Sequence, residues 1–174
     1  YGQMPHRTIL TGCGGVGKFM GVSQHHPQGW HTTITVWFLA IFARSLVDIL
    51  VDDLDQDALD GLKVDALKPN VVIRTTKDNY QAWITISEEE VAPEIASAVA
   101  KILAKRYGGD PGSTDAQHLG RLPGFTNRKN EYWTEKGYPF TGLHGEVSLG
   151  VPPAATQLLI EAEKHSASLP PPWT

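Results

Sequence analysis

The chain has 174 residues and a formal net charge of −4, from 15 basic and 19 acidic residues. Apolar residues make up 41% and charged residues 20%, a balance typical of globular proteins that excludes a disordered or collagen-like chain. This length suits one domain with a sizeable core. The net charge alone argues against general binding of polyanions, although it says nothing of how the charges are distributed.

The cysteine content and the hydropathy of the chain indicate which cellular compartment to expect. The single cysteine, Cys13, excludes an internal disulfide and a cysteine-rich zinc site, and it favours a reducing compartment, so we expect a cytoplasmic protein. The most apolar stretch, residues 33–51, is interrupted by Arg44 and Asp48. The uncharged part, 33–43, is shorter than the ~20 residues of a membrane helix, so we expect no membrane segment and no membrane partner.

The first half of the chain predicts three strands and a helix. Residues 1–32 follow no clear period, and the one element predicted there is a short strand at 7–10. The β-branched and aromatic run 34–42 predicts a strand, and after a turn near Arg44 the short apolar run 47–52 predicts a buried strand that ends in acids. A helix is predicted from the N-cap Asp55 to Pro69, because apolar residues recur there at helical spacing.

The second half predicts a hairpin, a long helix and a shorter one. Runs 71–75 and 80–86, separated by the polar turn 76–79, should pair as antiparallel strands. A capping box of Ser87 and Glu90 predicts the start of the next helix, and Gly108 with Gly109 predicts its end. A loop-rich segment at 110–126, a strand near 146–149, a helix at 153–165 and an extended tail at 169–174 follow.

The order of these elements indicates the fold class. An RRM-like (ferredoxin-like) α+β fold has the same succession: strand, helix, strand, strand, helix and a further strand. We predict such a core with additional N-terminal strands and loops and a short C-terminal helix. In this fold the helices cover one face of the sheet, and the other face is expected to be free for a ligand or a nucleic acid.

Acidic residues are concentrated around the predicted buried strand. Between residues 46 and 66, seven acids accompany one base, a local charge of −6. Asp52 and Asp53 stand at the end of the strand, where oxygen ligands on a rigid element suit a hard divalent cation such as Mg²⁺ or Mn²⁺. The alternative is that the acids stabilise the start of the following helix, which explains Asp55 and Asp57 better than Asp52 and Asp53.

A basic loop follows the long helix. The window 101–136 has a net charge of +3, and its segment 108–129 combines glycines, a histidine and several cations without periodicity. Asp110 is a candidate third carboxylate, and candidate phosphate-binding side chains are His118, Arg121, Arg128 and Lys129. An acidic patch facing a basic one is typical of a metal–nucleotide site, and the alternative is a solvated surface loop.

Other motifs are weaker. Residues 12–18 have P-loop spacing, but Phe19 stands where the motif requires Ser or Thr, which favours a flexible glycine loop. The spacing of the nearby cysteine and histidines fits no structural zinc site: Cys13, His25, His26 and His31. Four aromatic residues are candidate stacking platforms for bases, with core or rim packing as the alternative: Tyr80, Trp83, Trp133 and Tyr138.

Four blocks of sequence resemble the RepB-type primases of mobilisable plasmids, whose core is similar to that of the archaeo-eukaryotic primases. They are 51–54 (VDDL), 79–83 (NYQAW), 110–111 (DP) and 121–129 (RLPGFTNRK). The resemblance covers residues 41–138, and the last block is the most specific. It implies a DNA primase, a nucleotidyltransferase that synthesises short primers on single-stranded DNA for plasmid or mobile-element replication.

The resemblance also implies roles for individual residues. Asp52, Asp53 and Asp110 match the catalytic acids that hold Mg²⁺ or Mn²⁺. The matches for nucleotide binding are His118, Arg121 and Lys129. The expected DNA contacts, which the residue chemistry favours, are Arg128, Tyr80 and Trp83. Arg44 inherits no clear role, because Ser45 replaces the proline that usually follows in the family.

These lines together predict two-metal nucleotidyl transfer, with nucleoside triphosphates as substrates, single-stranded DNA as template and a replicative helicase as a candidate partner. Residues 41–150 would be the catalytic core, 1–40 a poorly assigned part of the same domain, and 151–174 a C-terminal helix and proline-rich tail. Two alternatives stay open: a non-catalytic, single-stranded-DNA-binding RRM-like module, and a P-loop nucleotide hydrolase that uses Lys18.

Overall fold

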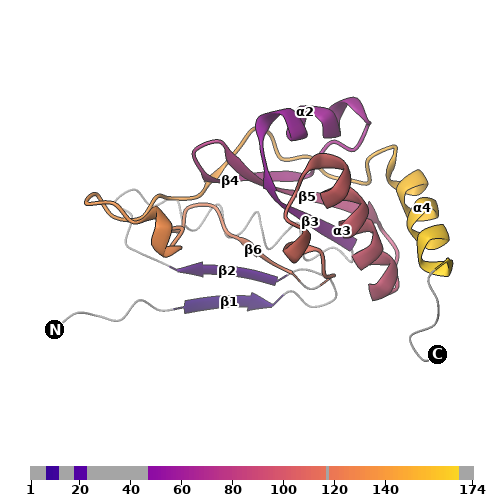
Figure 1. The fold of residues 1–174 in the computed structure, drawn as a ribbon, viewed down its shortest axis with the longest axis horizontal. Helices are drawn as coiled ribbons and strands as arrows, with labels where there is room; N and C mark the ends of the chain where they lie inside the picture. The colour runs from indigo at the N-terminus through magenta and orange to yellow at the C-terminus, as the bar shows by residue number, and fades with distance from the viewer. Residues whose placement is uncertain (1–6, 12–17, 23–46, 117, 169–174) are drawn as a thin grey trace.

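The computed structural model describes residues 7–11, 18–22, 47–116 and 118–168, and the statements below refer to these (Figure 1). The predicted strand at 34–42, the turn near Arg44 and the tail at 169–174 lie outside the described residues. The elements in chain order are β1 (Arg7–Thr11), β2 (Lys18–Val22), β3 (Val47–Leu54), α2 (Gln56–Val64), β4 (Val71–Thr76), β5 (Asn79–Ser87), α3 (Pro93–Tyr107), η1 (Pro111–Ser113), β6 (Leu119–Arg121), η2 (Asn130–Tyr132), β7 (Gly142–Leu143) and α4 (Ala155–Ala167).

The central sheet has the order β3-β5-β4-β7, and all of its neighbours are antiparallel. The hairpin of β4 and β5 is confirmed, as is the RRM-like α+β order of elements around it. The final strand was predicted near 146–149, which is wrong, because the strand that pairs with β4 is β7. Residues 146–149 are held outside the ladder instead, where Ser148 N donates to Asn70 O and the Asn70 amide donates to Gly150 O.

The helices agree with the sequence except at the start of α3 and at the end of α2, which stops at Val64, before the predicted limit at Pro69. Asp55 caps α2 by accepting from Ala58 N at 2.8 Å, as predicted. Helix α3 ends as predicted at Gly108, which adopts a left-handed conformation with φ 72°. The capping box at Ser87 is wrong, because α3 begins at Pro93. Proline is favoured in the first turn of a helix and disfavours helical geometry in the residue before it, so it sets the start.

The main core lies between the sheet and the three helices, which cover one face of the sheet (Figure 1). Its fully buried members come from every one of these elements and include Val51, Leu62, Ile84, Leu103 and Leu158. Helix α4 packs on α3 and adds an ion pair between Arg106 and Glu161, with Nη2 and Oε2 2.7 Å apart. None of the helices in the described part of the chain is long and apolar enough to cross a membrane.

The opposite face of the sheet carries a second, smaller core, so the prediction of a free face is wrong. Its buried members are Leu50, Val71, Ile73, Trp83 and Leu122. Strand β6 crosses this face, and a Cβ added to Gly120 would overlap Trp83 Cζ2. Large apolar residues on this face need cover from water, and β6 and Leu122 provide it.

A second sheet has the order β1-β2-β6, in which β1 and β2 are antiparallel and β2 and β6 are parallel. Lys18 is the first residue of β2. A P-loop lysine instead stands at the start of a helix that follows the glycine-rich loop. The alternative of a P-loop hydrolase that uses Lys18 is therefore wrong.

The contact of Gly120 with Trp83 gives the first prediction. Gly120→Ala should lower the free energy of unfolding by about 1–3 kcal/mol, because the added methyl group overlaps the indole ring. Urea denaturation measures this loss. Gly142→Ala is the matched control, because a Cβ there meets no atom within 4 Å, and its effect should stay within about 0.5 kcal/mol. Equal losses in the two variants would contradict the close packing of β6.

Candidate active site

A β-bulge at the end of β3 brings two consecutive carboxylates together. Val51 pairs with Ala82 and Leu54 with Tyr80, so Asp52 and Asp53 stand opposite the single residue Gln81. Val51 and Leu54 both belong to the helix-facing core although they are three residues apart, which a regular strand does not allow. The extra residue is accommodated at Asp53, whose φ of 59° lies in the left-handed region that aspartate tolerates better than most residues.

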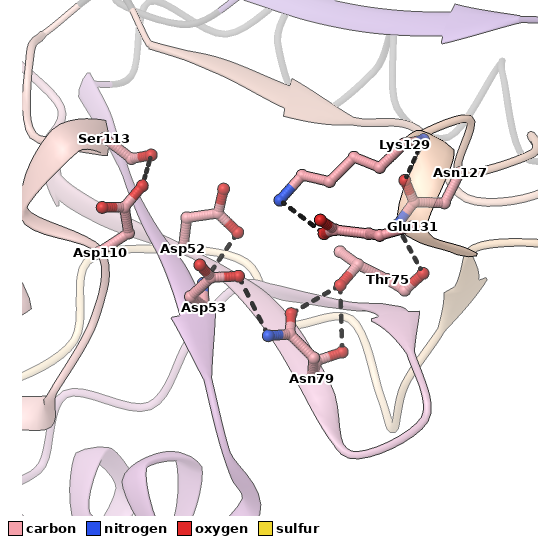
Figure 2. A network of polar contacts seen from close by, with 9 residues as sticks. All are labelled: Asp52, Asp53, Thr75, Asn79, Asp110, Ser113, Asn127, Lys129 and Glu131. Atoms are coloured by element: carbon pink, nitrogen blue, oxygen red, sulfur yellow. Dashed lines mark hydrogen bonds and ion pairs between the residues drawn. The ribbon is translucent and has the colours of Figure 1, made fainter. Parts of the chain in front are cut away.

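Hydrogen bonds hold the bulge in this shape (Figure 2). Asp53 N donates to Asp52 Oδ1 at 2.8 Å, and Asn79 Nδ2 donates to Asp53 Oδ1 at 3.0 Å. Asn79 is fixed in turn, because Thr75 Oγ1 donates to Asn79 Oδ1 at 2.6 Å. The β4–β5 hairpin therefore orients the Asp53 carboxylate.

Asp110 is attached to the same strand end through its backbone. Asp110 N donates to Asp52 O at 3.0 Å. The preceding residue must be glycine for the chain to approach so closely, because a Cβ at Gly109 would lie 2.9 Å from Asp52 O. The end of α3 is thus packed against the bulge, and the third predicted acid lies beside the first.

The carboxylate of Asp110 caps η1. It accepts hydrogen bonds from Ser113 Oγ at 2.7 Å and from Gly112 N at 2.8 Å, which lower the pKa of Asp110 (Figure 2). Within the described residues, no group of three or more His, Cys, Asp and Glu side chains is arranged to hold a metal ion. Asp52 and Asp53 have the oxygen donors that Mg²⁺ and Mn²⁺ prefer, whereas Asp110 does not converge with them in this structure.

Asp52, near the end of β3, is connected to β6. Burial raises the pKa of Asp52, against the opposing effects of hydrogen bonds from Asp53 N and the Gln81 side chain and of the Arg121 charge. Gln81 is 1% exposed, and its Oε1 accepts from Arg121 N at 2.8 Å. A single buried amide therefore connects Asp52 to the strand that carries Arg121.

The predicted cations lie within electrostatic range of the acids. The charges of His118 and Lys129 help to lower the pKa of Asp110. His118 Nδ1 is 3.2 Å from Asp115 Oδ2, and Lys129 Nζ is 4.0 Å from Glu131 Oε1. Figure 2 shows the Lys129 side chain reaching from its loop toward Asp52. The fold thus brings the acidic and basic patches of the sequence together.

Two of the three predicted DNA contacts are buried. Trp83 is 1% exposed beneath β6, and Tyr80 is 7% exposed in the helix-facing core, where its ring centroid lies 4.7 Å from that of His144. Their prediction as a stacking platform is wrong, because residues of opposite parity in β5 face opposite sides of the sheet. Arg128 is exposed, with its guanidinium carbon 5.2 Å from the centroid of the Tyr138 ring.

Three residues that support the site were not predicted: Asn79, Gln81 and Asn127. Asn127 is 1% exposed, and its Nδ2 donates to Thr75 O at 3.1 Å, which ties the basic loop to β4. Gln81 could have been found from the sequence, because it is a polar residue within the apolar run 80–86. Buried polar groups need partners, so such a residue marks a position that is hydrogen-bonded within the fold.

Comparisons with known proteins identify related primase sequences. The sequence model of the RepB DNA-primase N-terminal domain matches residues 40–144. Mobilization protein A of Escherichia coli is 42% identical over 90 residues, which are 52% of this chain and 13% of that protein. A DNA primase of Acidithiobacillus ferrooxidans is 36% identical over 94 residues, covering 52% of this chain and 26% of the relative. The chain therefore spans a minor part of both relatives.

Two solved structures have a similar fold. The crystal structure of primase RepB′ matches with a TM-score of 0.62 and 33% identity, covering 69% of this chain and 40% of that one. The catalytic domain of primase RepB′ in complex with initiator DNA matches with a TM-score of 0.61 and 33% identity, covering 69% and 60%. Since the family match extends over more than half of its length, the chain belongs to the RepB DNA-primase N-terminal domain family.

Proposed function

We propose that this chain is the catalytic part of a DNA primase, which joins nucleotides into short primers on a single-stranded DNA template. The observation that carries the proposal is the bulge pair Asp52 and Asp53, with the cations of the basic loop gathered beside it. Membership of the primase family and the likeness to the RepB′ catalytic domain, solved with initiator DNA, support it. The relative named mobilization protein A supports a role in plasmid or mobile-element replication.

The bulge pair is the proposed metal and catalytic centre. Asp52 and Asp53 would hold Mg²⁺ or Mn²⁺. The bound ion would activate the primer hydroxyl and neutralise the charge of the leaving pyrophosphate. The protein holds these two carboxylates in place before any ligand binds, through Asn79 and Gln81. Asp110 is the proposed third acid, and its carboxylate here accepts from Gly112 N and Ser113 Oγ.

The cations are proposed to bind the triphosphate. Arg121 offers a planar fork of donors, and Lys129 offers a mobile point charge. Asp115 Oδ2 accepts from Nδ1 of His118, so the imidazolium form of the ring would donate from Nε2 to a phosphate oxygen. Together these side chains hold the phosphates in line with the attacking hydroxyl, so the lower barrier comes from positioning and electrostatics.

The non-catalytic alternative, an RRM-like module that binds single-stranded DNA on its open sheet face, is disfavoured by the second core. That face is covered by β6 and Leu122, and its aromatic residue Trp83 is 1% exposed. The carboxylates at the end of β3 would also repel phosphates in the absence of a cation. A catalytic role explains these acids, whereas passive binding does not.

Neutralising one acid of the pair gives the main prediction of this proposal. Asp53→Asn should reduce primer synthesis by ~100-fold or more, because it removes one of the two carboxylates proposed to hold the divalent cation that stabilises the developing charge. The measurement is the formation of labelled products from ribo- or deoxynucleoside triphosphates on single-stranded templates with Mg²⁺ or Mn²⁺. Circular dichroism should show an unchanged fold.

Asp57→Asn is the matched control, because Asp57 is an exposed acid in the first turn of α2. Its activity should stay within about twofold of the wild type. Dinucleotide formation by Asp53→Asn at the wild-type rate would contradict the assignment of the bulge pair.

Truncation of Arg121 tests the triphosphate site separately. Arg121→Ala should raise KM for the nucleotide by about tenfold, since a charge-assisted hydrogen bond to phosphate contributes ~1.5–3 kcal/mol. The fold should persist, because the bond from Arg121 N to Gln81 belongs to the backbone and survives the change. Steady-state kinetics provide the measurement, with Arg74→Ala on β4 as the exposed control. An unchanged KM would exclude Arg121 from nucleotide binding.

A further inference from the structure

Residues 122–143 form a tightly bonded hairpin beside the candidate site, which we call the arm. Its two legs are joined by backbone hydrogen bonds of 2.8 Å from Gly124 N to Thr141 O, from Thr141 N to Phe125 O and from Asn127 N to Pro139 O. A tight turn closes the tip, where Gly137 N donates to Thr134 O at 2.8 Å. In Figure 1 the arm is the orange segment that extends beyond the end of β4.

The tip of the arm presents aromatic rings together with cations. The Arg128 guanidinium lies 5.2 Å from the centroid of the Tyr138 ring, and the Lys129 ammonium lies 5.9 Å from that of Tyr132. Trp133 is 58% exposed, although a large aromatic ring normally gains from burial. The arm therefore exposes an indole ring on which another planar group can stack.

The arm that carries Trp133 adjoins the candidate site. The side chain of Lys129, four residues before Trp133, reaches toward Asp52 (Figure 2). On the same leg, Asn127 Nδ2 donates to Thr75 O at 3.1 Å, which ties the arm to β4. The exposed ring of Trp133 therefore lies on a segment that is anchored beside the bulge pair.

We propose that Trp133 stacks on an unpaired base of single-stranded DNA and that Arg128 contacts the adjoining phosphate, so that the arm holds the template beside the site. The proposal rests on the proposed primase function and adds the place where its template binds. Exposed aromatic rings interleaved with cations are typical of surfaces for single-stranded nucleic acid. A duplex cannot stack on Trp133 in this way, because the faces of its bases are covered by the neighbouring bases.

The charges of the arm agree with this occupant. Its cations are Arg128, Lys129 and Lys136, and its acids are Glu131 and Glu135. Glu131 Oε1 lies 4.0 Å from Lys129 Nζ, which offsets part of the lysine charge, and the exposed Arg128 lies over the Tyr138 ring. A phosphate that follows a base stacked on Trp133 would meet a cation on the same arm.

The test is the affinity of the whole chain for a fluorescent oligothymidylate, measured by anisotropy. Trp133→Ala should weaken binding about tenfold, as expected for the loss of one stacked base, and Trp133→Phe should retain most of the affinity. Ile160→Ala on α4 is the control, because Ile160 is an apolar side chain that is 38% exposed and far from the arm in the chain. Binding to a blunt duplex should not depend on Trp133.

Primer synthesis gives a second measurement. Trp133→Ala should raise KM for the template about tenfold and leave the rate at saturating template within about twofold, because the ring binds the strand and does not touch the reacting atoms. Unchanged oligothymidylate binding by Trp133→Ala, or an equal loss for single-stranded and duplex DNA, would overturn the proposal.

The Asp53→Asn background separates this proposal from the proposed function. If Trp133→Ala weakens oligothymidylate binding in the Asp53→Asn background, the proposed role of the arm is supported. This holds even if the wild-type chain synthesises no primer, in which case only the proposed function fails. If the wild-type chain synthesises primers but DNA binding does not change in Trp133→Ala, the proposed function is supported and the proposed role of the arm is overturned.

Discussion

The candidate site depends on one local irregularity, the bulge at Asp52 and Asp53, and on the hydrogen bond from Asp110 N to Asp52 O. The bulge turns two consecutive carboxylates away from the helix-facing core, while the hydrogen bond fixes the end of α3 against them. Both features need special backbone geometry, a left-handed aspartate at 53 and a glycine at 109. Backbone strain of this kind costs about 1–3 kcal/mol and persists where the surrounding structure enforces it, as Asn79 and Gln81 do here.

The second core explains how the basic loop reaches the acids. Trp83 and Leu50 need cover on the sheet face away from the helices, and β6 crosses them at Gly120. The same strand brings Arg121 N into a hydrogen bond with Gln81, which connects Arg121 to Asp52. Apolar burial and the site are therefore coupled: packing β6 on the indole ring sets the position of a cation beside the bulge pair.

Local patterns in the sequence predicted most of the fold. Hydrophobic periodicity, the cap at Asp55 and the turn at 76–79 identified α2 and the β4–β5 hairpin. The charge blocks and the family resemblance identified the acids and cations that the fold brings together. Long-range contacts were not predictable in this way. The cover over Trp83 and the path of 146–149 along Asn70 each depend on residues distant in the chain.

The central claim is that Asp52 and Asp53 together hold a divalent cation with the nucleotide. Titration of Mn²⁺ in the presence of a nucleoside triphosphate, followed by electron paramagnetic resonance of the free ion, tests it directly. The account predicts that the wild-type chain and Asp57→Asn deplete the free Mn²⁺ signal beyond the nucleotide alone, and that Asp52→Asn and Asp53→Asn do not. Equal depletion by all four proteins would show that the ion binds elsewhere and would contradict the account.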